Sequence, residues 1–80
     1  MPRYFFDTAN GSRFHDTDGV EMADRREARI YAVRFAGECI ADDPELLETV
    51  TDFRVEVRDS DGLMLFTVTT FVTESPAARR

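Results

Sequence analysis

Residues 53–62 read Phe53-Arg54-Val55-Glu56-Val57-Arg58-Asp59-Ser60-Asp61-Gly62. Apolar residues alternate with charged ones up to Arg58, which is typical of a strand with one buried face. The turn-forming residues that follow lead into residues 63–72, which are rich in β-branched and aromatic side chains. The stretch therefore predicts a β-hairpin.

The register of this hairpin follows from its apolar residues. A four-residue loop at residues 59–62 gathers the strongest apolar side chains on one face, whereas a slip by one residue scatters them over both faces. The expected cross-strand pairs are Val57 with Met64, Val55 with Phe66, and Phe53 with Val68.

A second hairpin is predicted at the N-terminus, where the aromatic-rich residues 3–8 and the short run 13–15 flank Ala9-Asn10-Gly11. We expect a three-residue loop in which Gly11 adopts a left-handed conformation. The expected pairs are Phe6 with Phe14, Asp7 with Arg13, and Phe5 with His15, which place Tyr4, Phe6 and Phe14 on the inner face.

A helix is predicted between the two hairpins. Asp24-Arg25-Arg26-Glu27 has the pattern of a capping box, so the helix starts at Arg25, and Asp42-Asp43-Pro44 ends it. Residues 45–47 are expected to form a short second helical turn. The apolar face of the main helix consists of Ala28, Tyr31, Ala32, Phe35, Ala36 and Cys39.

These elements predict an α+β fold, a two-layer ββαββ domain with a four-stranded, antiparallel-rich sheet and one helix packed on one face. The domain spans residues 1–73, and a mobile tail follows at residues 74–80. The pattern leaves the strand order open. Because one helix covers only one sheet face, the outer face is expected to meet water or a partner.

Composition narrows the classes of partner. The net charge of −6 disfavours duplex nucleic acid and anionic membranes, both of which attract basic proteins. Cys39 is the only cysteine, and no set of Cys and His residues has metal-ligand spacing, so we expect no metal, no cofactor and a reducing compartment.

The apolar run Tyr4-Phe5-Phe6 is too short for a signal peptide or membrane span, which favours a cytoplasmic protein. An 80-residue chain without disulfides is marginally stable alone, which favours association.

Two candidate interfaces for self-association or for another protein follow from the pattern. The first is an apolar patch on the outer sheet face, formed by Phe5, Leu63, Leu65 and Phe71. The second is a ridge on the helix, formed by Ile30, Val33, Gly37 and Ile40. Glycine inside a helix costs about 1 kcal/mol relative to alanine, and close approach of another backbone would explain it. The alternative is that Val33 and Ile40 broaden the core stripe while Ile30 is a lone exposed residue.

A third candidate surface is the arginine cluster at the start of the helix, which consists of Arg25, Arg26 and Arg29. The helix dipole disfavours positive charge at this end. Either nearby acidic residues form an internal ion-pair cluster with the arginines, or the arginines bind an anion or an acidic partner. The acidic residues close enough in sequence are Asp16, Asp18, Glu21 and Glu27.

Groups that support catalysis or metal binding do not converge in the sequence. His15 is expected on the outer sheet face and Cys39 on the core face of the helix, so they do not form a nucleophile and base pair, and we expect no enzyme. The repeated turns Asp16-Thr17-Asp18-Gly19 and Asp59-Ser60-Asp61-Gly62 each supply only two carboxylates, too few for an EF-hand calcium site. Local turn hydrogen bonds explain them.

The opening Met1-Pro2-Arg3-Tyr4-Phe5-Phe6, the run from Asp16 to Glu21, the helix start at Asp24, and the late Asp-Gly hairpin together resemble a known family. It is an uncharacterised family, a domain of unknown function, of short alphaproteobacterial, largely rhizobial, proteins. The resemblance covers about residues 1–70. It implies a soluble bacterial protein and no particular activity.

A looser resemblance links the strand-strand-helix half to HicB-type antitoxins. The sequence thus favours a non-catalytic interaction module, homodimeric through the outer sheet face or the helix ridge. The alternative is a regulator of the HicB-antitoxin type that binds a toxin partner or single-stranded nucleic acid. In that alternative, bases would stack between the arginines and aromatic residues of the open sheet, which are Arg3, Arg54, Arg58, Phe5 and Phe71.

Overall fold

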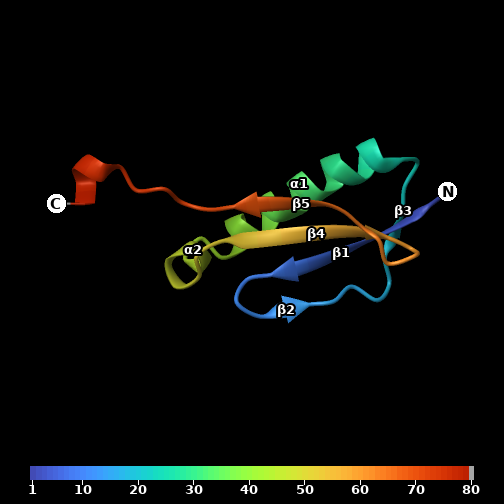
Figure 1. Cartoon of the computed structure of the whole chain (residues 1–80), viewed down its shortest axis with the longest axis horizontal. Coiled ribbons are helices and arrows are strands. Elements are labelled where there is room, and N and C mark those ends of the chain that lie inside the picture. Colours follow the sequence, from blue (N-terminus) through green and yellow to red (C-terminus); the bar gives the residue numbers. More distant parts are fainter. Residues whose placement is uncertain (80) are drawn as a thin grey trace.

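The sheet is built around β4 (Phe53–Asp59), which pairs antiparallel with β1 (Arg3–Ala9) on one side and β5 (Met64–Thr70) on the other. This computed structural model describes residues 1–79. The strand order is β2-β1-β4-β5, with β2 (Arg13–Phe14) and β3 (Val20–Glu21) both pairing with β1 (Figure 1). β5 therefore forms one edge of the sheet.

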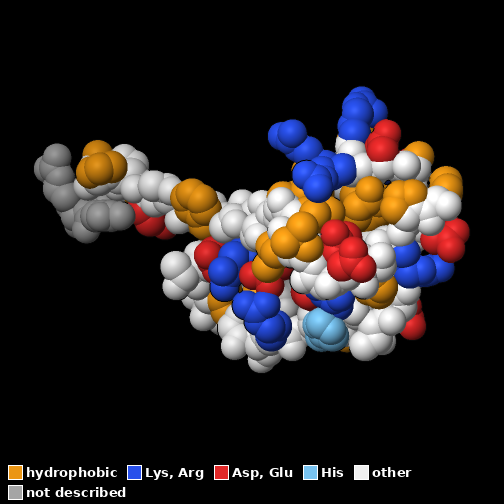
Figure 2. All heavy atoms as spheres, turned by 45° about the vertical axis from the view of Figure 1, so that its right-hand side comes forward, with side chains coloured by type: hydrophobic (Ala, Val, Ile, Leu, Met, Phe, Trp, Pro, Cys, Tyr) orange, Lys and Arg blue, Asp and Glu red, His pale blue; other side chains and the backbone are white. Residues whose placement is uncertain are grey.

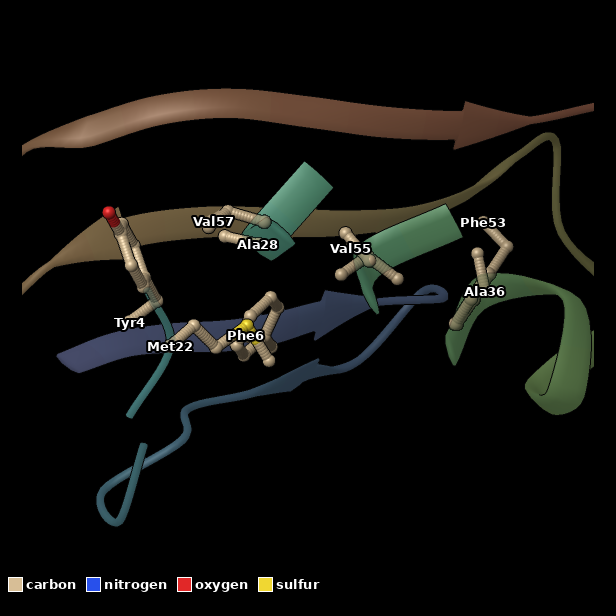
Figure 3. Packing of buried hydrophobic residues seen from close by; sticks show 9 residues of the cluster. Tyr4, Phe6, Met22, Ala28, Ala36, Phe53, Val55 and Val57 are labelled. Atoms are coloured by element: carbon tan, nitrogen blue, oxygen red, sulfur yellow. The ribbon is translucent and has the colours of Figure 1, made fainter. Parts of the chain in front are cut away.

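One face of the sheet is covered by α1 (Arg25–Asp42), and the core lies between these two layers (Figure 1). Phe53, Val55 and Val57 from β4 are the largest side chains that are fully buried. They pack with side chains from β1 and α1, as Figure 3 shows. The other buried members of the core cluster are Tyr4, Phe6, Met22, Ala28, Ala32 and Ala36.

The α+β class and the two-layer arrangement are confirmed, with one correction. The sheet has five strands, because Val20 and Glu21 add the short strand β3 opposite Tyr4 and Arg3. A two-residue strand has no alternation from which it could be predicted. The predicted second helical turn is present as α2 (Leu46–Thr49).

The predicted bounds of α1 are confirmed, and local hydrogen bonds account for them. The Asp24 carboxylate accepts from the Glu27 amide at 2.9 Å, and the Glu27 side chain accepts from the Ala23 amide at 3.2 Å. At the other end, the Asp43 amide donates to the Cys39 carbonyl, and Pro44 follows. Both ends are thus set by residues within a few positions of the boundary.

The predicted register of the N-terminal hairpin is wrong by two residues. Thr8 lies opposite Phe14 and Ala9 opposite Arg13, so the loop consists of residues 10–12. The Asn10 side chain accepts from the Ser12 amide and starts the loop one residue later than expected. Phe14 is 65% exposed rather than buried, because β2 lies at the sheet edge.

The predicted register of the C-terminal hairpin is also wrong by two residues. Val57 lies opposite Phe66, Val55 opposite Val68, and Phe53 opposite Thr70. One residue of the shift comes from the turn, where the Asp59 amide donates to the Leu63 carbonyl and Arg58 lies opposite Met64. The other comes from a β-bulge between Val57 and Arg58. The Asp59 carboxylate holds the turn by accepting from the amides of Asp61 and Leu63. Because the shift is even, Phe66 and Val68 keep the predicted face, but Met64 is half exposed.

Beyond β5 the chain leaves the sheet. Residues 71–78 are all exposed, and a short 3-10 helix, η1 (Pro76–Arg79), closes the described chain. Figure 1 shows this segment extending away from the two layers. The mobility expected for residues 74–80 stays a prediction, and Arg80 lies outside the described residues.

Candidate interaction surfaces

A groove of about 650 Å³ runs between the N-terminal half of α1 and β5. Its β5 wall is formed by residues 65–68. Its α1 wall is formed by Arg25, Arg26, Arg29 and Val33. A smaller hollow shares three of these helix residues and adds Ile30. In Figure 2, arginine side chains stand out at the top, where α1 lies in Figure 1, above hydrophobic side chains.

The strand that borders this groove carries an open edge. Among residues 1–79, β4 is the only strand that pairs with β5. The sequence of β5, Met64-Leu65-Phe66-Thr67-Val68-Thr69-Thr70, contains no charged residue and no proline. The backbone amides and carbonyls along an open edge can pair with a strand of another molecule. Soluble proteins usually prevent this by placing charged residues, prolines or β-bulges in their edge strands. Seven uncharged residues at an edge therefore favour pairing with a further strand.

The three arginines of the groove do not form the internal ion-pair cluster that was one prediction. In the part of the chain that the structure describes, no salt bridge involves Arg25, Arg26 or Arg29. The acidic residues expected to pair with them have other partners: Glu21 pairs with Arg3 at 2.9 Å, and Glu27 completes the helix cap. The positive charge therefore faces the groove without a carboxylate partner among residues 1–79.

Only part of the helix ridge packs against the core. Ile30 is 43% exposed and Val33 is 55% exposed, whereas Ile40 packs against the core. A Cβ at Gly37 would meet no atom within 4 Å. Among residues 1–79, no atom beyond the adjacent helix backbone lies within 4 Å of that Cβ position, so the packing of one copy does not explain a glycine inside this helix. The ridge residues Ile30 and Val33 are continuous with the groove.

The centre of the outer sheet face is ionic rather than apolar. Asp7 and Glu56 lie opposite each other on β1 and β4, and both are buried. The Asp7 carboxylate accepts from Arg58 Nε at 2.9 Å and from Arg58 Nη2 at 3.3 Å. Glu56 contacts Arg13, and Arg54 Nη1 lies 3.9 Å from its other oxygen. Buried carboxylates in this arrangement each have a cationic partner.

The protonation of Asp7 follows from these contacts. Burial raises the pKa of its carboxyl, but the hydrogen bonds from Arg58 and the Asp16 amide, with the charges of Arg58 and His15, outweigh burial. The pKa of Asp7 therefore lies below its ordinary value, and the group stays ionised. His15 Nδ1 is 3.6 Å from Asp7, and its side chain is 66% exposed.

The Asp16 carboxylate provides a hydrogen-bond acceptor for the part of β1 that lies between its pairings with β3 and β2. β3 pairs with the beginning of β1 and β2 with its end, and the Phe6 amide between them donates to Asp16 Oδ2 at 3.1 Å. Asp16 Oδ1 accepts from the amides of Asp18 and Gly19. Burial raises the pKa of Asp16, but the hydrogen bonds from these three amides outweigh burial, so its pKa is also below the ordinary value. Turn formation thus accounts for the repeated Asp-Gly motif, and Gly19 has the positive φ that it requires.

The predicted apolar patch on the outer face is not assembled as one surface. Phe5 is half-buried, with the Arg58 guanidinium 4.7 Å from its ring centroid, and Leu65 packs against the core. Leu63 and Phe71 are exposed, but they flank opposite ends of the seven-residue strand β5. At about 3.3 Å per residue, these two side chains are more than 20 Å apart. The arginines considered for stacking bases are also engaged: Arg58 binds Asp7.

The two nucleophile and base candidates lie on different layers. His15 Nε2 is 3.0 Å from Arg58 Nη2 on the outer sheet face. Cys39 packs against the core on the helix side. Burial raises the pKa of the Cys39 thiol, and the carboxylates of Asp42 and Glu38 raise it further. The thiol is therefore a weak nucleophile at neutral pH. Among residues 1–79, no group of three or more His, Cys, Asp or Glu side chains is placed to hold a metal ion.

Two features of these surfaces were missed from the sequence. The open edge of β5 depends on the strand order, which the pattern leaves open, although the uncharged run of residues 63–72 is a signal for it. The pair between Asp7 and Arg58 joins residues 51 positions apart. The alternation of Arg54, Glu56 and Arg58 signals a charged face, but only the pairing of β1 with β4 identifies its partner.

Comparison with known proteins places the chain in a family. The model of the family described as "Domain of unknown function (DUF6894)" matches residues 3–72, so the chain belongs to this family. No curated protein and no solved structure matches the chain. Within residues 1–79, no helix is both long enough and apolar enough to cross a membrane.

Proposed function

We propose that this member of the DUF6894 family is a non-catalytic interaction module that self-associates through the side formed by α1 and β5. The observation that carries the proposal is the uncharged open edge of β5 beside a groove whose helix wall exposes Val33. A second copy offers the same edge, and strand pairing across a two-fold axis satisfies both edges at once. Ile30 and Val33 supply the apolar area that such pairing would bury.

The helix ridge and β5 edge are favoured over the outer sheet face for a physical reason. The outer face is centred on buried carboxylates whose cationic partners, such as Arg58 for Asp7, come from the same chain. A partner covering this face would remove water from the exposed parts of those ions, which costs free energy. The α1 and β5 side exposes apolar side chains and unpaired strand backbone, which gain from being covered.

A binding role is favoured over an enzymatic one because the reactive groups do not converge. Cys39 packs in the core with a raised thiol pKa, and His15 contacts Arg58 on the other face of the sheet. Among residues 1–79, His15 and Cys39 do not meet around one cavity with a third reactive group. The bacterial origin and the cytoplasmic location suggested by the sequence are part of the same proposal.

The solution mass of Val33→Glu tests the proposal. We expect the wild-type protein to have twice the chain mass of 9.2 kDa by light scattering, and Val33→Glu to shift to the monomer mass. Phe14→Glu is the matched control, because Phe14 is equally apolar and exposed but lies at the opposite edge of the sheet. It should remain a dimer.

A wild-type monomer at all concentrations, or equal loss of association in both variants, would refute the proposal. Binding of single-stranded nucleic acid that weakens steeply with salt would instead favour the alternative function, a regulator of the HicB-antitoxin type. Association driven by apolar surface lacks that steep dependence.

A further inference from the structure

Among residues 1–79, no strand or helix pairs with the segment that follows β5. Residues 71–78 are all exposed, and the Ala78 amide donates to the Ser75 carbonyl within the segment. Phe71 and Val72 are 62% and 65% exposed. The segment continues the line of β5 beyond the sheet, as Figure 1 shows. Two adjacent large apolar residues projecting into solvent indicate a surface that is covered in the associated state.

The groove lies where the same segment of a second copy would arrive. Arg25, Arg26 and Arg29 line the groove together with residues 65–68, around the middle of β5. When two identical strands pair antiparallel about a two-fold axis between Thr69 and Thr70, residues 71–74 of each copy lie beside residues 65–68 of the other. The continuation of β5 in one copy therefore passes the arginine end of α1 in the other.

We propose that residues 71–74 of a second copy lie in the groove between α1 and β5, with the Glu74 carboxylate against Arg25, Arg26 and Arg29. This inference rests on the proposed self-association and names the segment that fills its groove.

The charge of residues 71–74 and the strand face on which their side chains lie both fit the groove. Glu74 is the only charged residue between positions 71 and 78, and it is acidic, whereas the groove carries three arginines without carboxylate partners among residues 1–79. Thr70 lies opposite Phe53 and so faces the helix layer. Side chains two residues apart share a face of a strand, so continued strand geometry places Val72 and Glu74 on that face too. Val72 then faces the ridge, and Glu74 faces the arginines.

Disulfide trapping between copies tests the placement. In a Cys39→Ser background, which removes the native thiol, a tagged Arg29→Cys chain is mixed with an untagged Glu74→Cys chain and mildly oxidised. We expect a cross-linked pair that contains one chain of each kind. The control mixture replaces Arg29→Cys with Phe14→Cys, at the opposite sheet edge, and should give no cross-link. Glu74→Cys alone should not cross-link either, because an antiparallel pair holds its two tails at opposite ends.

The outcomes separate this inference from the proposed function. If the chain is a dimer but Arg29→Cys and Glu74→Cys do not cross-link, the placement of the segment is wrong while self-association stands. Cross-linking of Glu74→Cys to itself would equally overturn the antiparallel arrangement. A strictly monomeric wild-type chain would overturn both.

Charge exchange gives a second, non-covalent test. Glu74→Arg and the double variant Arg26→Glu, Arg29→Glu should each self-associate about tenfold more weakly, because attraction becomes repulsion at both ends of the pair. Mixing the two variants restores attraction at both ends, because one end brings the exchanged charges together while the other keeps the wild-type pair, and should restore wild-type affinity. Glu48→Arg, a charge reversal on α2 outside the groove, is the control. Failure of the mixture to recover affinity would overturn the inference.

Discussion

Arg58 on β4 holds the buried carboxylate of Asp7 on β1 through two hydrogen bonds, 2.9 Å from Nε and 3.3 Å from Nη2. The same guanidinium donates to the Asp16 carbonyl at 2.7 Å and lies over the Phe5 ring. One side chain thus joins the two central strands to the loop between β2 and β3. An internal ionic contact thus stabilises the outer sheet face.

Asp7→Ala is expected to lower the free energy of unfolding by about 3 kcal/mol, because it leaves the Arg58 charge largely buried without its counter-ion. The measurement is urea denaturation. Glu21→Ala is the control: its salt bridge with Arg3 is exposed, and removing it should cost about 0.5 kcal/mol. Equal losses in the two variants would contradict the assigned role of Asp7.

Stability is expected to fall in acid because of Asp7 and Asp16. Both carboxyls have a pKa below the ordinary value in the folded chain, so the unfolded chain binds protons first as the pH falls. Their contribution is fully present above the unfolded pKa of about 3.9 and is lost as the pH falls through the lower folded values. Thermal unfolding across this range measures the effect. Asp7→Asn should show a shallower decline, and an unchanged decline would contradict the assignment.

Gly19→Ala is expected to destabilise the fold by about 2 kcal/mol. Gly19 has φ +71°, and an added Cβ would lie 2.8 Å from a Phe5 ring carbon and 2.9 Å from Arg3 Cγ. Gly62→Ala shares the positive φ but meets no atom within 4 Å, so only the conformational cost of about 1 kcal/mol applies. Denaturation midpoints of the two variants provide the comparison. A smaller loss for Gly19→Ala than for Gly62→Ala would be inconsistent with this packing.

Gly37→Ala is expected to stabilise the chain by about 1 kcal/mol, since alanine favours the helix and its Cβ meets no atom of the domain. The gain is measured at a concentration low enough to keep the protein monomeric. A bulky Gly37→Leu change should weaken self-association if the ridge lies in the interface. Destabilisation of the monomer by Gly37→Ala would show a contact that the fold described above lacks.

The sequence predicts best what local interactions decide. The ends of α1 are set by Asp24 and Pro44 within a few residues of each boundary, and the prediction of both ends is confirmed. The two hairpin registers are not local in this sense. The Asn10 loop shifts the first register by two residues, and the turn after Asp59 together with the bulge beside Arg58 shifts the second by two. Alternation alone does not distinguish registers that keep the same faces.

The candidate surfaces were predictable only in part, for a topological reason. Ile30 and Val33 were predicted to belong to a candidate interface ridge on the helix, and the structure exposes both, whereas Ile40 of the same ridge packs against the core. The contribution of β5 depends on its place at the sheet edge, which requires the strand order. The expected apolar patch around Phe5 does not form, because the turn at Gly19 and the Arg58 side chain cover the Phe5 ring. Long-range contacts of this kind leave no periodic signal in one sequence.

Hydrogen–deuterium exchange of the wild-type chain at low and high concentration tests self-association through α1 and β5 most directly. Raising the concentration should slow exchange of the β5 amides that do not bond to β4, and leave exchange at β2, on the opposite edge, unchanged. Exchange that is independent of concentration throughout the chain, or protection that appears at β2 instead of β5, would contradict self-association through α1 and β5.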